Sequence, residues 1–358
     1  MAGSVGPSIV ESGLLFVLDI ADKNCFNLFN NLITNPSTAA SYSANQNVTI
    51  TQDGQYVKVV SNQNTSTPGA WPIGGTITIK PNTDYFFGIK AKRVSTPTPR
   101  FYISTGGNTQ IAFTNTTLTS TDSYIWSYIR FNTSATSVKV GFLWSGPLVG
   151  SELSVETVTL NEISTKDLVL PGNNYTLVNL NNTFYDLQNG GSIILDGTDD
   201  YISVYNTINL GNTFTINAVI KLTSNNSDTV IFGTNANGSD NWFGITTNKL
   251  YTYFTEIADV NNNSHTGNTT LSNGTWYYVT LTVNGSTVTF YLNGVLDGTK
   301  TVAFTIGSWN GTVDLGRRGG VAQRYFNGNI AFVNGYNRVL SNSEILQNFN
   351  AVRSRFGI

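Results

Sequence analysis

Hydrophobic and polar residues alternate with a period of two over most of this chain. Tyr85, Phe87, Ile89 and Ala91 share one side of an extended segment, and shorter segments elsewhere repeat the pattern. Successive side chains of a β-strand point to opposite faces, so this alternation predicts strands that bury one face. Gly, Pro, Asn and Ser separate the segments, as is usual at turns. The chain is therefore predicted to be all-β.

The predicted strands fall into two groups, each large enough for a β-sandwich. The first group comprises segments 57–60, 76–79, 85–91, 101–103, 111–113, 123–131, 138–144 and 153–160. The second comprises 14–18, 214–222, 229–232, 242–246, 250–254, 276–283 and 287–292. Asn284-Gly285 is expected to join the last two segments as a hairpin turn, because this dipeptide favours tight turns. A length of 358 residues also suits two domains.

The C-terminal segment is the exception, because its hydrophobic residues recur at helical spacing. These residues are Ile345, Phe349, Val352 and Phe356. Ser341 can accept a hydrogen bond from the amide of Glu344, and the Glu344 carboxylate can reach back to the Ser341 amide. Leu340 can pack on Ile345 across this first turn. We therefore expect one short helix that begins after Ser341 and packs on a sheet.

Composition and charge exclude several classes of function. Only 11% of the residues are charged, the net charge is −2, and Lys and Arg form no run, so the electrostatic footprint of nucleic-acid binding is absent. Arg317-Arg318, beside glycines, is expected in a solvated loop rather than at a phosphate. No apolar segment is long enough to span a membrane, and residues 1–13 lack the pattern of an export signal. Cys25 has no partner for an internal disulfide, which suits synthesis in a reducing cytosol.

Four ordered blocks resemble one fold family. The C-terminal block, residues 326–345, reads F-x-G-x-I followed by Y-N-R-x-L-S-x-x-E-I. Segments 190–202, 212–218 and 274–294 supply a G-G-S…D-G-T-D-D-Y motif, an N-T-F-T-I strand and a W-Y-x-V hairpin. Together they resemble laminin-G-like, concanavalin A-type jelly rolls found in bacteriophage structural proteins. Members of that family bind sugars, bind proteins or decorate particles, so the resemblance implies a fold rather than one function.

The opening strand of this jelly roll lies far from the rest of it in the sequence. Residues 12–19 resemble the family's first strand, whereas the next family motif begins only at Gly190. We therefore expect a discontinuous jelly-roll domain made of residues 1–25 and 166–358. The intervening residues, 26–165, resemble carbohydrate-binding-module sandwiches, with Y-x-F-x-x-x-A-K at 85–92 and V-x-V-G-F at 138–142. Insertion of one sandwich into another is tolerated when the ends of the insert lie close together.

The sequence offers few candidate catalytic residues. The single histidine, His265, stands in a polar segment with no nucleophile motif, and we expect it in a solvated loop. The E-x-D-x-x-E strand of laminarinase-type glucanases does not occur. We therefore expect a protein that is not an enzyme, and a glycan-active hydrolase is the alternative.

A metal site is suggested by the resemblance alone. Laminin-G-type domains often hold Ca²⁺ at the rim of the sandwich through oxygen ligands. Asp199 and Asp200, in a glycine-rich turn, could serve in this way, so no cofactor is required but Ca²⁺ binding stays open. The other interpretation is a turn in which Asp196 to Asp199 bind their own backbone. Many members of that family carry a carboxylate where this chain has Ala331. This difference weakens the case for a cation site inferred from the resemblance.

Sugar binding would rest on exposed aromatic rings, which stack on the faces of pyranose units. The candidates are Trp71, Trp242, Tyr251, Tyr253 and Trp309. Each stands in a turn-like context or on one face of a predicted strand. The alternative is that these rings belong to the cores of the two sandwiches, where most aromatic residues of such folds lie.

The expected function follows from these observations and from the resemblance. We expect a non-catalytic protein on the virion surface of a tailed phage, as a head decoration, a fibre or a tail-associated adhesion protein. Its partners would be other virion proteins, further copies of itself, and host-surface polysaccharide, but neither nucleic acid nor membrane. A purely structural cement protein without a ligand is the remaining alternative.

Overall fold

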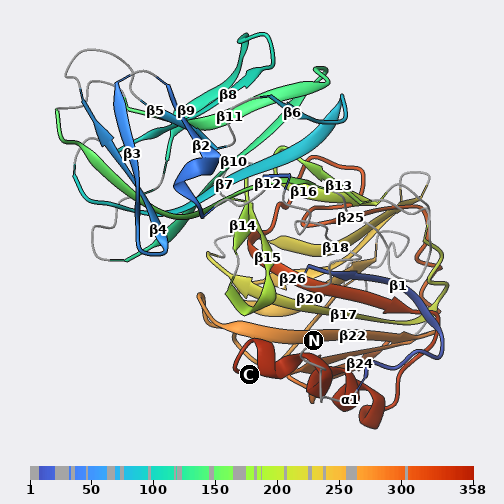
Figure 1. The fold of residues 1–358 in the computed structure, drawn as a ribbon. Coiled ribbons are helices and arrows are strands. Elements are labelled where there is room, and N and C mark those ends of the chain that lie inside the picture. Colours follow the sequence, from blue (N-terminus) through green and yellow to red (C-terminus); the bar gives the residue numbers. More distant parts are fainter. Residues whose placement is uncertain are drawn as a thin grey trace. The chain divides into compact units, whose positions relative to one another are not determined.

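The structure is a computed structural model. It describes residues 8–20, 32–33, 37–45, 47–62, 69–72, 76–95, 98–116, 118, 123–144, 149–163, 175–180, 184–186, 188–204, 208–224, 228–236, 239–254, 264–302 and 305–358. Backbone contacts divide the chain into two compact units (Figure 1). The larger unit comprises residues 1–26, 165–180 and 184–358, and the smaller comprises residues 27–164 and 181–183.

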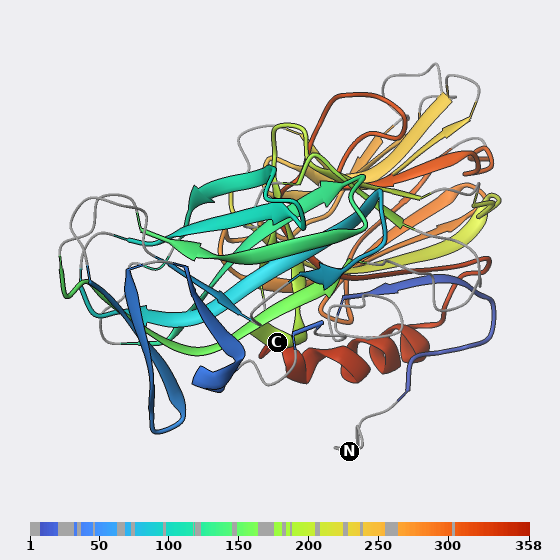
Figure 2. The same ribbon diagram turned by 45° about the horizontal axis from the view of Figure 1, so that its top comes forward.

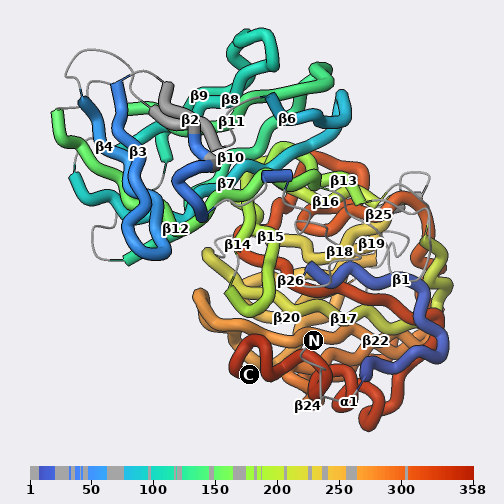
Figure 3. The backbone as a smooth tube through the Cα atoms, viewed as in Figure 1, coloured from blue at the N-terminus to red at the C-terminus, as the bar shows by residue number. Residues whose placement is uncertain are grey.

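An eight-stranded sheet forms one layer of the larger unit. Its strand order is β14-β15-β26-β17-β22-β23-β24, and β1 also pairs with β26. The strands are β1 (Leu14–Asp19), β14 (Tyr185–Asp186), β15 (Ser192–Asp196), β17 (Thr213–Leu222), β22 (Trp276–Asn284), β23 (Thr287–Leu292), β24 (Val295–Thr301) and β26 (Asn327–Tyr336). In Figure 3 the blue tube of β1 runs beside the red tube of β26, so the first described strand and the last one are neighbours.

A seven-stranded antiparallel sheet forms the second layer of this unit, in the order β13-β16-β25-β18-β19-β20-β21. The strands are β13 (Tyr175–Val178), β16 (Tyr201–Val204), β18 (Thr229–Ala236), β19 (Ser239–Thr246), β20 (Lys249–Phe254), β21 (Ser264–Thr266) and β25 (Thr312–Leu315). Phe16 stacks on Phe232 with ring centroids 5.7 Å apart, and Phe243 stacks on Phe290 at 6.1 Å. Both pairs join one sheet to the other, so the core lies between the two layers.

The predicted C-terminal helix is present and covers the outer side of the eight-stranded sheet (Figures 1 and 2). Helix α1 spans Asn342–Val352, and Ser341 and Glu344 form the predicted capping box. Leu340 and Ile345 are buried in one cluster, as a hydrophobic staple requires. Phe349 packs on Tyr278 with ring centroids 5.8 Å apart. The cap and the apolar face were therefore both readable from the sequence.

A chain of buried hydrogen bonds runs beneath this helix. Asn217 Nδ2 donates to Asn334 Oδ1 at 2.8 Å, and Asn334 Nδ2 donates to Tyr336 Oη at 3.2 Å. Tyr336 Oη donates to the carbonyl of Val10 at 2.8 Å, and Asn348 of the helix donates to Tyr336 Oη at 3.0 Å. The amide of Val10 donates to Asn348 Oδ1 at 2.7 Å. These bonds fasten the N-terminal segment and the helix to the same sheet.

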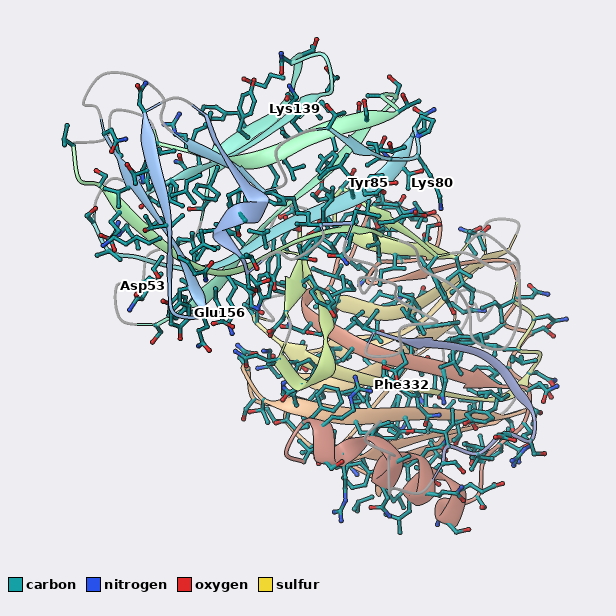
Figure 4. All side chains as sticks on the ribbon, in the orientation of Figure 1. Asp53, Lys80, Tyr85, Lys139, Glu156 and Phe332 are labelled. Atoms are coloured by element: carbon teal, nitrogen blue, oxygen red, sulfur yellow. The ribbon has the colours of Figure 1, made fainter. Side chains whose placement is uncertain are left out.

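The smaller unit is also built from two antiparallel sheets, a five-stranded one in the order β10-β7-β12-β4-β3 and a six-stranded one in the order β2-β5-β11-β8-β9, where β6 pairs with β11. Its strands are β2 (Tyr42–Asn45), β3 (Val48–Asp53), β4 (Tyr56–Ser61), β5 (Gly69–Pro72), β6 (Ile77–Thr78), β7 (Thr83–Arg93), β8 (Arg100–Thr105), β9 (Gln110–Asn115), β10 (Ile125–Thr133), β11 (Ser137–Leu143) and β12 (Glu152–Glu162). Tyr85, labelled in Figure 4, and the alternate residues Phe87, Ile89 and Ala91 are buried in its core.

The fold class predicted from the sequence is confirmed: all-β, with sandwich layers and one short C-terminal α-helix among the described residues. Short 3₁₀ turns lie at Ala39–Ser41, Gln188–Gly190 and Arg353–Arg355. The turn prediction was wrong by one residue, because Asn284 pairs with Thr287 and leaves Gly285 and Ser286 as the loop. A left-handed backbone at Gly285, with φ of 58°, explains why glycine stands there.

Candidate functional site

Two of the predicted sugar-binding residues lie on the outer face of the seven-stranded sheet. Along β20, Leu250, Thr252 and Phe254 are buried, and Phe254 contacts the ring of Trp309 in the core at 5.9 Å. Because strand residues alternate between faces, Tyr251 and Tyr253 point away from that core. Both are half-buried. They therefore present rings on the surface of the sheet.

Strand register places Trp242 on the same outer face. Trp242 of β19 lies directly opposite Tyr253 of β20, and Gly244 lies opposite Tyr251. The centroid of Trp242 is 4.8 Å from that of Tyr251 and 6.0 Å from that of Tyr253. Trp242 is only 1% exposed. It lies beside the two tyrosines on this face and is almost fully covered, so the tyrosines rather than the tryptophan offer exposed ring surface.

The same row of the sheet continues across the neighbouring strands. Trp242 pairs with Gly233 of β18, and Gly233 pairs with Asp314 of β25. A Cβ atom at Gly233 would lie 2.5 Å from the amide nitrogen of Gly319 and 2.7 Å from the carbonyl of Arg317. The segment between β25 and β26, residues 316–326, therefore lies with its backbone directly on this glycine. Glycine at position 233 is what admits the loop to the outer face.

Arg317 is held firmly by this arrangement. Its Nε donates to Asp314 Oδ2 at 2.8 Å, and its guanidinium lies over the ring of Tyr201, 3.4 Å from the centroid. Asp314 is fully buried and also accepts the amide of Gly320 at 2.9 Å. Burial by itself lowers the pKa of Arg317, but the charge and hydrogen bond of Asp314 more than offset it, and the pKa is raised. The expectation of a solvated loop is wrong for Arg317, whose side chain is 15% exposed.

Arg324, from the other end of the same loop, lies over Trp242. Its guanidinium carbon is 5.0 Å from the centroid of the ring, and its Nη1 forms an ion pair with Asp228. Asp228 also accepts the hydroxyl of Thr246. We call the set of Trp242, Tyr251, Tyr253 and Arg324 the outer strip. The sequence predicted its three aromatic members but not Arg324. The only sequence signal near Arg324 was the Arg317-Arg318 pair earlier in the same loop.

Of the two remaining aromatic candidates, one belongs to the core and the other is not described. Trp309 is fully buried and packs between Phe214, at 4.9 Å, and Phe232, at 6.4 Å, so it belongs to the core. Trp71 lies on β5 of the smaller unit, and its side chain is outside the described part of the chain. The interpretation of these rings as core residues thus holds for Trp309.

His265 was expected in a loop and instead lies on the short strand β21. Its ring stacks on Phe290 with centroids 5.4 Å apart. Burial, together with the charge of Lys300, lowers its pKa, so the imidazole is neutral at neutral pH. Its ring thus packs on Phe290 of the other sheet, close enough to Lys300 to feel its charge.

The predicted acidic pair is part of a triplet in the turn between β15 and β16. One carboxylate oxygen from each of Asp196, Asp199 and Asp200 lies within 4.8 Å of the others. Asp196 Oδ1 accepts the amide of Thr198 at 2.7 Å, and Asp200 Oδ2 accepts the amide of Asp196 at 3.1 Å. The turn is therefore closed by its own side chains, as the second interpretation supposed. The donor set, all oxygen, also fits a hard cation.

Comparison with known proteins supports the fold of the larger unit. Residues 196–346, which include the outer strip, match a family described as the Concanavalin A-like lectin/glucanases superfamily. This match supports a concanavalin A-like jelly-roll fold for this part of the chain. No curated protein matches the sequence. Among the described residues, no helix is long and apolar enough to cross a membrane.

Three solved structures illustrate the range of similar folds. Domain 4 of an extracellular arabinanase from Geobacillus stearothermophilus, in complex with arabinotriose, is 15% identical, with 51% of this chain and 82% of that chain covered and a TM-score of 0.36. A sialidase carbohydrate-binding module from Ruminococcus gnavus, bound to sialyllactose, is 22% identical. The match covers 38% of this chain and 81% of that chain, with a TM-score of 0.33. A pentraxin from Limulus polyphemus is 17% identical. The match covers 43% of this chain and 78% of that chain, with a TM-score of 0.36.

Proposed function

We propose that this protein is a non-catalytic glycan-binding protein on the virion surface of a tailed bacteriophage, and that it binds sugar with the outer strip. The observation that carries the glycan part is the pair of half-buried tyrosine rings, Tyr251 and Tyr253, both in contact with the ring of Trp242. Residues two apart on a strand are separated by roughly 7 Å. Two neighbouring rings at this spacing form a platform longer than one ring.

The platform is also rigid, which favours binding. The buried ring of Trp242 contacts both tyrosines, and Tyr251 is held further by the hydroxyl of Ser264. Burial raises the pKa of Tyr251, so its hydroxyl is protonated and can donate at neutral pH. A rigid aromatic surface loses little conformational entropy when a ligand settles on it. Each ring thus combines a flat apolar face with a polar tip, as sugar recognition requires.

Binding to immobilised bacterial surface polysaccharides tests this proposal. The native protein should bind at least one polysaccharide of a broad panel, and Tyr253→Ala should weaken that binding by removing half of the platform. Tyr277→Ala is the matched control, because Tyr277 is a half-buried tyrosine on β22 of the other sheet. Equal loss in both variants, or no binding by the native protein, would contradict glycan binding through the outer strip.

The virion part of the proposal rests on the C-terminal motif, residues 326–345, which resembles phage structural proteins. It is tested by a low-resolution map of virions that carry this protein, together with mass spectrometry of the purified particles. Symmetric copies on the head or the tail are expected, in contact with other virion proteins. Absence of the protein from purified particles would contradict this assignment.

A second candidate concerns the acidic turn, where the three clustered carboxylates favour a Ca²⁺ ion. Asp196, Asp199 and Asp200 would hold the ion, which would brace the turn between the two sheets. Ca²⁺ should then raise the melting temperature of the native protein and leave that of Asp199→Asn unchanged.

The same carboxylates are the residues that the hydrolase alternative would use. Release of reducing ends from a polysaccharide, lost in Asp199→Asn or Asp200→Asn, would show that the protein is a glycan-active enzyme instead.

A further inference from the structure

We infer that the outer strip selects acidic sugars and that Arg324 is the residue that recognises the acid group. This inference rests on the proposed glycan binding and goes beyond it, because it names the chemical class of the ligand. It follows from three observations: the stacking of Arg324, its backbone conformation, and the part of its guanidinium that the fold leaves to solvent.

The guanidinium of Arg324 lies in the outer strip with one edge engaged. Its plane is held over Trp242, and Nη1 contacts Asp228. A guanidinium carries five N–H donors in a rigid fork. Among the described residues the structure gives the other donors of Arg324 no acceptor, and the side chain is 34% exposed. One edge of the fork is therefore fixed by the protein, and the other edge is presented outward.

The backbone of Arg324 is unusual in a way that points to function. Its φ is 58°, in the left-handed region that glycine adopts without cost and that arginine rarely enters. The carbonyl of Arg324 accepts the amide of Val230 at 3.0 Å, which ties this conformation to β18. Glycine would satisfy the backbone better here. Strained positions of this kind gather at binding sites, where the side chain is what matters.

The neighbouring rings place the outward edge next to the proposed sugar platform. Trp242 contacts Tyr251, Tyr253 and Arg324 at once, with distances of 4.8, 6.0 and 5.0 Å from its centroid. A sugar unit that lies on the tyrosines would therefore bring a ring substituent within reach of the guanidinium. Arginine binds carboxylates through two parallel hydrogen bonds, so a uronic-acid type of substituent fits best.

The experiment compares oligosaccharides that differ only in charge. The probes are a hexamer of galacturonic acid and a hexasaccharide of hyaluronan, each tested beside its fully methyl-esterified, uncharged form. Binding is measured by calorimetry with the native protein, Arg324→Gln, Arg324→Lys and the control Arg353→Gln. Arg353 is an exposed arginine at the end of α1, so the control removes the same charge far from the outer strip.

An acidic probe is expected to bind about 10- to 100-fold more tightly than its ester, as charged hydrogen bonds allow. Arg324→Gln should abolish that preference, whereas Arg353→Gln should keep it. Arg324→Lys should keep attraction but lose most of the gain, because lysine cannot form the paired bonds. Added salt should weaken only the acidic probe.

Three outcomes would overturn the inference, and they are distinguishable. If each ester binds as tightly as its acid, the platform binds sugar but Arg324 does not select charge, and the proposed function stands. If no probe binds the native protein although a polysaccharide of the panel does, this inference fails and the proposed glycan binding stands; if neither the probes nor the panel bind, both fail. Thermal melts of each variant check the fold, and Arg324→Gly, which relieves the backbone, is the second variant if Arg324→Gln unfolds.

Discussion

Replacement of Asn348 by Leu tests the buried polar chain beneath α1. Asn348 is fully buried, accepts the amide of Val10 at 2.7 Å and donates to Tyr336 Oη at 3.0 Å. Leucine fills a similar volume but offers neither group. A buried amide that loses its acceptor costs about 1–3 kcal/mol, and the second lost hydrogen bond adds about 1 kcal/mol.

A total near 3 kcal/mol should lower the melting temperature by about 6–12 °C, given the size of the larger unit. Calorimetry measures this shift, and amide hydrogen exchange at Val10 should accelerate with it, because the N-terminal segment loses its attachment. Asn350→Leu is the control, since Asn350 lies half-buried on the same helix. If the Asn348 variant has the same melting temperature as the control and the Val10 amide exchanges no faster, the polar chain does not hold this segment.

Three further perturbations have defined outcomes. The hydrogen bonds from Arg338, followed by the amide of Ser341, lower the pKa of Glu344 to about 2 from 4.5. Its carboxylate therefore stabilises the fold above the unfolded pKa, and this is lost as the pH falls through the folded value, so the melting difference from Glu344→Gln should shrink on acidification. Gly233→Ala should displace loop 316–326 and lower stability by more than Gly107→Ala does, because a Cβ at Gly233 meets backbone atoms at 2.5 Å, whereas one at Gly107 has only an ordinary contact with Thr105 Oγ1 at 3.8 Å. Equal melting of the two variants would contradict this placement of the loop. A variant in which a short Gly/Ser bridge replaces residues 26–164 should fold as an all-β domain by circular dichroism, and it should be more stable than residues 166–358 alone, because β1 pairs with β26.

Elements defined by local pattern were predictable from the sequence. The strand around Tyr85 buries the four residues that alternate on one side, and the helix after Ser341 has the predicted cap and staple. Both depend on interactions within a few residues, so the sequence contains all that they need. The hairpin turn failed by one residue, because register depends on the cross-strand partners of the whole β22–β23 pair as well as on the turn dipeptide.

The same reasoning predicted only part of the candidate site. Trp242 and Trp309 stand in similar polar surroundings in the sequence, yet one supports the outer strip and the other fills the core. Alternation states that neighbouring residues face opposite ways, but it does not say which face a second layer covers. That choice depends on the pairing of β19 with β18 and β20 and on the packing of one sheet against the other.

The sequence by itself thus determined the all-β class, the alternation of each strand and the start of the helix, because these follow from backbone geometry and short-range hydrogen bonds. Only the tertiary structure decided that loop 316–326 lies on Gly233 and carries Arg317 and Arg324 to Tyr201 and Trp242. The residues of each pair are separated by many positions in the chain. Their contact exists because the antiparallel register of β16, β25, β18 and β19 aligns Asp314, Gly233 and Trp242 in one row, and because a glycine in that row leaves room for another backbone.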